Sequence, residues 1–190
     1  GLIARPAPRP TAEVIAEAAE AAADADVAVV VVGLTEEQET EAADKETLRL
    51  PGQQDALVNA VVDAAKRTIV VVNAATPVLM PWAERVDAVL VIGLPGQEGG
   101  HAVAKVLLGE LEPTGRLVTT WPVADGATPG WNVAPVEGRL EYREGTYVGY
   151  RGHFPFGHAL EPAAWLGEGL GYTTWAYSNA FVEEGPAAPV

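Results

Sequence analysis

An acidic stretch at residues 33–45 holds the side chains best suited to chemistry in this 190-residue chain. Three interpretations of the stretch are open, and a solvated acidic loop is the plainest of them. A divalent cation site is the second, although the order of the acids is not that of an EF-hand loop. The third is a general acid, because carboxyl groups that crowd together raise one another's pKa toward neutral pH. The stretch carries one lysine and five acids: Glu36, Glu37, Glu39, Glu41 and Asp44.

Two other patterns are less informative. The glycine-rich segment 93–100 joins a predicted strand to a predicted helix, as phosphate-binding loops do. It lacks both the GxGxxG spacing and a following Lys-Ser/Thr pair, and Glu98 adds charge of the wrong sign, so we expect a tight turn rather than a nucleotide site. The three histidines are scattered, and the single serine, Ser178, lies in no nucleophile elbow. Neither a zinc site nor a Ser-His-Asp hydrolase is indicated.

The composition narrows the classes of partner. Twelve Lys and Arg against 26 Asp and Glu give a net charge of −14, which repels nucleic acid and anionic membrane surfaces. No apolar run approaches the roughly 20 residues of a membrane-spanning helix. The absence of cysteine excludes thiol chemistry and leaves the compartment open. We expect a cytoplasmic location slightly ahead of a secreted one, because no signal-peptide pattern is present.

Strands and helices alternate along the first part of the chain, in a pattern typical of βαβ units with a mostly parallel sheet. Continuous β-branched runs predict strands buried on both faces, and each precedes a loop at the carboxyl edge of the sheet, where ligands bind. The predicted strands are 27–32, 69–72, 88–92 and, less regularly, 117–121, and the predicted helices begin at Thr11 or are marked by residues 57–65 and 102–107.

These elements predict an α/β fold, a three-layer sandwich with a mostly parallel sheet and an irregular C-terminal extension. All thirteen aromatic residues lie at or after Trp82, and seventeen of the twenty glycines lie at or after Gly93, so the second half differs from the first. We expect residues 1–10 to be a linker or domain join, residues 11–180 to form the domain, and residues 181–190 to be a tail toward a further domain.

Several motifs follow one another in a fixed order along most of the chain. Together they resemble the C-terminal α/β sandwich domain of family 3 glycoside hydrolases, the β-glucosidase-type enzymes. The matching segments are the acidic motif 39–45, Leu-x-Leu-Pro-x-x-Gln at 48–54, the strand and Pro-Trp pair at 70–82, Pro-Gly-Gln-Glu-Gly-Gly at 95–100, the Pro-x-Gly-Arg-Leu turn within 107–117, Thr-Thr-Trp-Pro at 119–122, and the aromatic segments 142–151 and 166–175.

The resemblance implies a retaining β-glycosidase that hydrolyses O-glycosidic bonds without a metal or other cofactor. Its nucleophile, an aspartate, would come from an N-terminal TIM-like barrel domain of the same enzyme, and its substrate would be a β-glucoside or oligosaccharide. Motif matching assigns the general acid/base to Glu41, with Glu39 as the runner-up, and makes Gln38 and Asp44 candidate substrate-binding residues. The alternative is a non-catalytic carbohydrate-binding or docking module on the same fold.

The chain departs from the family pattern within the acidic motif itself. Ala42 and Ala43 replace a Gly-Tyr pair, which removes a flexible hinge and a ring that could pack near the sugar. Lys45 replaces arginine and loses its bidentate geometry. Gln38 stands where relatives often have tryptophan. We expect Asp44 and Lys45 to form an ion pair that fixes the loop.

Overall fold

The centre of the molecule is a small sheet of three parallel strands in the order β1-β2-β3. The strands are β1 (Ala28–Gly33), β2 (Thr68–Asn73) and β3 (Ala88–Val91), each within one residue of its predicted ends. This computed structural model describes residues 11–42, 44–131, 134–153, 161–182 and 185. Because the strands are parallel, the loops that leave their carboxyl ends emerge at one edge of the sheet, as expected.

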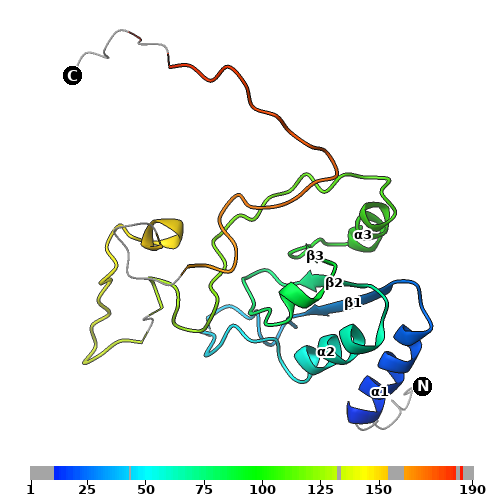
Figure 1. Cartoon of the computed structure of the whole chain (residues 1–190). Helices are drawn as coiled ribbons and strands as arrows, with labels where there is room; N and C mark the ends of the chain where they lie inside the picture. Colours follow the sequence, from blue (N-terminus) through cyan, green and yellow to red (C-terminus); the bar gives the residue numbers. More distant parts are fainter. Residues whose placement is uncertain (1–10, 43, 132–133, 154–160, 183–184, 186–190) are drawn as a thin grey trace.

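Helices cover the sheet from two sides, which gives the predicted α/β sandwich (Figure 1). The helices α1 (Thr11–Ala23) and α2 (Gln54–Ala64) pack against each other on one side, and α3 (Gly99–Leu107) lies on the other. Two short 3-10 helices, η1 (Ala83–Arg85) and η2 (Gly149–Gly152), complete the regular elements of the described residues.

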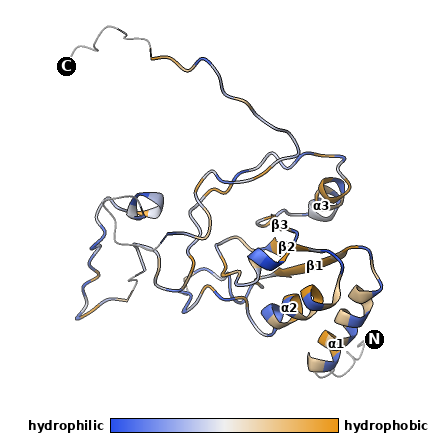
Figure 2. Cartoon of the chain, viewed as in Figure 1, coloured by the Kyte–Doolittle hydropathy of each residue, from blue (hydrophilic) through white to orange (hydrophobic). Residues whose placement is uncertain are grey.

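The apolar core lies between the sheet and α2. Val30 and Val32 of β1 belong to this core together with Val70 and Val72 of β2. Val58 and Val61 of α2 pack against them. Figure 2 shows the strands as the most apolar continuous part of the ribbon. Trp82 is completely buried at the rim of this core, and its indole Nε1 donates a hydrogen bond of 2.8 Å to Asp55 on α2. That bond satisfies the only polar atom of the buried ring.

The second face of β1 differs from the prediction of a strand buried on both sides. Val29 and Val31 are 46% and 64% exposed, whereas Val71 of the neighbouring strand is buried. β1 is an edge strand of this sheet, so the helix that covers the second face does not extend over it. The β-branched run correctly predicted the strand, but burial on both faces holds only for β2.

The segment after α3 is irregular, and the strand expected at residues 117–121 is not formed. Leu117 and Trp121 each exchange hydrogen bonds with the returning segment 163–168, and Trp121 and Ala164 form an isolated antiparallel bridge. The bonds skip the intervening residues, and Val118 is 90% exposed, so no continuous ladder develops. The expected C-terminal extension is therefore a pair of antiparallel segments held at two points (Figure 1).

The returning segment is fastened to the end of α3 by two side chains. The Tyr172 hydroxyl donates to the carbonyl of Val106 at 2.7 Å, at the end of the helix, where the same carbonyl also accepts the N–H of Gly109 at 3.0 Å. Glu112 accepts bonds from both the hydroxyl and the N–H of Thr173, and these bonds hold the pKa of Glu112 below its ordinary value. A Cβ on Gly171 would lie 2.4 Å from the Glu112 carboxylate, so a glycine is needed for this approach.

The expected linker at residues 1–10 and most of the expected tail at 181–190 lie outside the described residues, so both boundaries remain predictions. Within the part of the chain that is described, no helix is both long enough and apolar enough to cross a membrane.

Substitutions on the two faces of β1 can be compared directly, because adjacent valines lie on the buried and the exposed face. Val30→Ala removes two methyl groups from the core and should lower the free energy of unfolding of this chain by about 2 kcal/mol. Val31→Ala, on the exposed face, should change it by less than about 0.5 kcal/mol. Urea denaturation followed by circular dichroism measures both. Equal losses at the two positions would contradict the one-sided burial of β1.

Candidate functional site

The acidic loop begins where β1 ends, at Gly33. Gly33 pairs with Asn73 at the end of β2, and the next N–H, that of Leu34, donates to the Asn73 carbonyl at 3.1 Å. A Cβ on Gly33 would lie 2.0 Å from that carbonyl oxygen, so only glycine allows this approach. The acidic loop and the loop after β2, residues 74–77, therefore start side by side at the carboxyl edge of the sheet.

The first turn of the acidic loop is closed by Gln38. Its side-chain oxygen accepts a bond from the Thr35 N–H at 3.0 Å and another from the Thr35 hydroxyl, and the Thr35 carbonyl accepts the N–H groups of Gln38 and Glu39. Gln38 thus has a local structural role, in addition to lining a hollow described below. A tryptophan at this position could not make the same bonds, because its ring has a donor but no acceptor.

Glu39 and Glu41, the two candidates for the proton donor, have different surroundings. The Glu39 carboxylate accepts a 2.6 Å hydrogen bond from the N–H of Ala75, in the loop that follows β2. Glu41 is exposed and makes no hydrogen bond or ion pair with any of the described residues. The structure therefore ties Glu39 to the protein and leaves the carboxyl group of Glu41 open to solvent.

The residue after Glu41 has an unusual backbone conformation. Ala42 has φ of 65°, in the left-handed region that favours glycine. An alanine pays roughly 1–2 kcal/mol to stay there. The loop thus keeps the backbone turn that a glycine would make at this position, although the glycine itself is absent. Ala43, the second replaced residue, lies outside the described residues.

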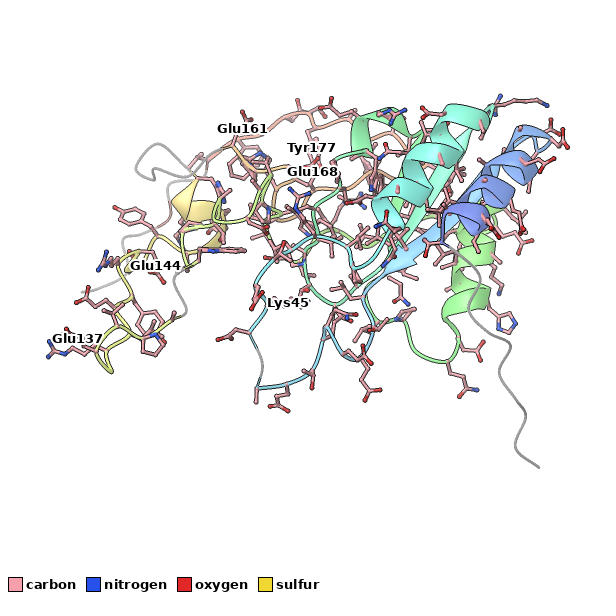
Figure 3. All side chains as sticks on the ribbon, turned by 90° about the horizontal axis from the view of Figure 1, so that it is seen from below. Lys45, Glu137, Glu144, Glu161, Glu168 and Tyr177 are labelled. Carbon is pink, nitrogen blue, oxygen red and sulfur yellow. The ribbon has the colours of Figure 1, made fainter. Side chains whose placement is uncertain are left out.

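Asp44 and Lys45 do not form the expected ion pair with each other. The Lys45 ammonium instead donates to the hydroxyl of Thr76, so Lys45 does fasten the loop, but to the loop after β2. Asp44 is exposed, and its carboxylate has no partner among the residues that the structure describes. Figure 3 shows Lys45 between the sheet and the irregular segment that carries Glu137 and Glu144.

Two hollows flank the second half of the acidic loop, and both are lined by residues 44–46 and by Leu48. The first, of about 250 Å³, lies between this loop and Pro77 and Val78 and includes Gln38 in its wall. The second, of about 690 Å³, opens toward Trp131 and Pro135. Asp44 therefore faces concave surface on both sides, whereas Glu39 and Glu41 line neither hollow.

An aspartate far along the chain holds the end of the acidic segment in place. Asp125 accepts hydrogen bonds from the Leu48 N–H at 2.8 Å and from the Thr47 hydroxyl at 2.6 Å. Its burial raises its pKa, but these two bonds and the charge of Arg49 together outweigh that effect and lower the pKa of Asp125 below its ordinary value. Sequence reasoning missed this residue, and its neighbours Ala124 and Gly126 give no signal of a role.

The glycine-rich segment 93–100 forms the expected tight turn. Gly93 and Gly96 have φ of 59° and 71°, and a Cβ on Gly99 would lie 2.5 Å from the ring of Pro95. Glu98 pairs with His101 at 2.7 Å on the surface. No group of three or more potential metal ligands occurs in the described ranges.

Comparison with known proteins identifies the relatives of this arrangement. The family model described as the glycosyl hydrolase family 3 C-terminal domain matches residues 6–159. The probable β-glucosidase H of Aspergillus flavus is 38% identical over 198 residues, which cover 95% of this chain and 23% of that protein. The thermostable β-glucosidase B of Acetivibrio thermocellus is 40% identical over 173 residues, which cover 90% of this chain and 23% of that protein.

Solved structures agree with these relatives. The β-glucosidase from Kluyveromyces marxianus in complex with glucose superposes with a TM-score of 0.83 at 38% identity, over 88% of this chain and 20% of that one. DesR, a β-glucosidase from Streptomyces venezuelae in complex with D-glucose, gives 0.79 at 38% identity, over 86% and 21%. This chain spans less than a quarter of the length of each of these proteins.

The lowered pKa of Asp125 leads to a prediction about pH. A carboxylate with a lowered pKa in the folded state stabilises the fold above its unfolded pKa, and this contribution is lost as the pH falls through the lower, folded value. Because Asp125 is exposed and solvent screens its interactions, Asp125→Asn should lower the free energy of unfolding by less than about 1 kcal/mol at pH 7, and by less and less below about pH 4. Urea denaturation at several pH values measures the difference.

Asp44→Asn is the matched control, because it removes the same charge from an exposed carboxylate that has no hydrogen-bond partner among the described residues. It should change the free energy of unfolding by less than about 0.5 kcal/mol at every pH. A pH-independent effect of Asp125→Asn, or one equal to that of the control, would contradict the role of Asp125 in holding residues 47–48.

Proposed function

Because this chain belongs to the glycosyl hydrolase family 3 C-terminal domain family, we propose that it is the acid/base-bearing half of a retaining β-glycosidase of the β-glucosidase type. The substrate is a β-glucoside or oligosaccharide, consistent with the β-glucosidase names of the relatives and with the glucose in two related structures. The nucleophilic aspartate comes from a TIM-like barrel domain of the same enzyme. The chain's small share of its relatives' length leaves room for such a domain.

The contrast between Glu39 and Glu41 carries the assignment of the proton donor. A general acid must come within hydrogen-bond reach of the departing oxygen, and a carboxyl group that the protein already holds elsewhere is less available for that contact. Glu41 has no such bond among the described residues, whereas Glu39 would first have to break its bond to Ala75. We therefore assign the acid/base role to Glu41 and give Glu39 the role of holding the loop that presents Glu41.

The reaction then proceeds in two steps. Glu41, as the acid, gives its proton to the glycosidic oxygen while the aspartate of the barrel attacks the anomeric carbon. Glu41, now a carboxylate, takes a proton from water as the water hydrolyses the glycosyl–enzyme bond. A retaining enzyme needs the two carboxyl groups about 5–5.5 Å apart, so the barrel must pack against the edge of the sheet from which the acidic loop projects.

The position of Asp44 suits a contact with substrate. Asp44 is exposed and lines both hollows, three residues beyond Glu41, and a carboxylate can accept hydrogen bonds from sugar hydroxyls. Gln38 lines the smaller hollow, but its side-chain oxygen is already engaged with Thr35. Between the two candidate substrate-binding residues, we favour Asp44.

The test of Glu41 compares leaving groups in the full-length protein that carries this chain. Glu41→Gln should lower kcat/KM for an alkyl β-glucoside about 10²–10⁴-fold, because the poor leaving group needs a proton. The value for a dinitrophenyl β-glucoside, whose leaving group needs none, should fall less than about tenfold. Azide, which attacks the glycosyl–enzyme without base assistance, should raise the turnover of this variant.

Glu39→Gln is the matched control for Glu41→Gln, because it removes the same negative charge two residues away. Its amide oxygen can still accept the bond from the Ala75 N–H, so both substrates should be affected similarly and mildly. A strong dependence on the leaving group in Glu39→Gln, together with equal losses in Glu41→Gln, would reverse the assignment.

The large hollow beside Trp131 favours a second candidate, a non-catalytic carbohydrate-binding module, because an indole offers a flat apolar surface to a sugar ring. Calorimetric titration of the isolated chain with cello-oligosaccharides separates the two functions. We expect no binding at millimolar concentration by the chain alone. Binding that Trp131→Ala abolishes, in a full-length protein without glycosidase activity, would support the module instead.

A further inference from the structure

A side-chain amide lies against the free edge of β1, where the acidic loop begins. The Gly33 N–H donates to the side-chain oxygen of Gln54 at 2.7 Å, and the side-chain nitrogen of Gln54 donates to the Gly33 carbonyl at 2.9 Å. The same nitrogen donates to the carbonyl of Pro51 at 3.1 Å. Gln54 is half-buried and is the first residue of α2.

These three bonds hold both ends of the long connection between β1 and α2. Gly33 is where that connection starts, and Pro51 is close to where it ends. On its other side Gly33 touches the backbone of Asn73 so closely that no Cβ fits. Gly33 is therefore held on both sides. β2 pairs with it on one side, and on the other the side-chain amide of Gln54 exchanges two hydrogen bonds with its backbone, as a neighbouring strand would.

We propose that Gln54 is a positioning residue for the proton donor, in an inference that rests on the function proposed above. Glu41 lies eight residues beyond Gly33, and its own side chain has no partner among the described residues to orient it. The position of Glu41 therefore depends on the backbone of the loop. Gln54 fixes the direction of that backbone at Gly33, and the bonds of Glu39 to Ala75 and of Lys45 to Thr76 hold it farther along.

The partners of Gln54 distinguish this role from helix capping. A capping side chain would bond to the free N–H groups at the start of α2, but every hydrogen bond described for the Gln54 amide joins it to a residue before the helix. The preceding residue, Gln53, is exposed and makes no side-chain capping bond either. Of these two adjacent glutamines, only Gln54 bonds to the start of the acidic loop.

The experiment uses Gln54→Met and Gln54→Glu in the full-length protein. Methionine has a similar size and loses all three bonds, while glutamate keeps the acceptor for the Gly33 N–H and loses both donors. Displacing a catalytic group by about 1 Å can cost on the order of 10²-fold in rate. We expect kcat/KM for the alkyl β-glucoside to fall about 10–100-fold and that for the dinitrophenyl β-glucoside less than about threefold.

The matched controls are Gln53→Met and Gln53→Glu, which should leave both substrates unchanged. On the dinitrophenyl substrate, whose second step is slow, azide should partly restore the turnover of Gln54→Met, as for a variant that lacks the acid/base group. On the alkyl substrate, KM should change less than kcat. A purely structural role would lower the rates on both substrates equally and would not respond to azide, and that result would overturn the inference. Gln54→Glu keeps the acceptor for the Gly33 N–H and decides the question if Gln54→Met does not fold.

Measuring Glu41→Gln on the same two substrates keeps the two proposals apart. If Glu41→Gln depends on the leaving group and both Gln54 variants do not, the positioning role is wrong and the proposed function stands. If Glu41→Gln shows no such dependence, the proposed function fails first.

Discussion

The register between β1 and β2 is the constraint on which the rest of this structure depends. Parallel pairing sets Gly33 opposite Asn73, so the two loops that follow leave the sheet at the same place and in the same direction. Two later contacts of the acidic loop use this proximity, the bonds of Glu39 to Ala75 and of Lys45 to Thr76. A shift of one residue would move the valines of β1 to the opposite face and separate these partners.

The charged residues of one short segment have two different roles. Glu39 and Lys45 bind the neighbouring loop, while Glu41 and Asp44 project from the backbone between and beside them without partners in the described chain. Anchoring groups thus bracket an unanchored carboxyl group.

The strands and helices could be predicted because each is encoded locally. The β-branched runs 28–33 and 68–73 fit strands whatever surrounds them, and the apolar spacing on α2 fits a helix that covers them. The run at 117–121 was predicted on the same basis and is wrong, since its partner lies in the irregular segment 163–168, whose course no local pattern reveals. The exposure of Val31 likewise follows from the position of β1 at the edge of the sheet, which the β-branched run does not reveal.

The candidate site was predictable only in part, for a similar reason. The acidic motif marks the loop, and parallel topology places it at the carboxyl edge, but the hydrogen bonds that distinguish Glu39 from Glu41 join residues 36 positions apart. The bond between Asp125 and Thr47 spans 78 positions. Contacts of this length leave no periodic trace in the sequence. The ion pair expected between Asp44 and Lys45 was wrong for the converse reason. The two residues are adjacent in the sequence, but the partner of Lys45 is Thr76, 31 positions away.

The clamp of Tyr172 and Thr173 on the end of α3 has a consequence for the order in which the protein forms during synthesis. The three strands need only residues up to Val91 and can pair soon after that point leaves the ribosome. The bonds of Tyr172 to the Val106 carbonyl and of Thr173 to the Glu112 carboxylate join residues more than 60 positions apart, so they form only after residues 172 and 173 have been made. The sheet can thus assemble early in translation, whereas the irregular half is completed only after these two residues have been made, when contacts of long sequence separation can close.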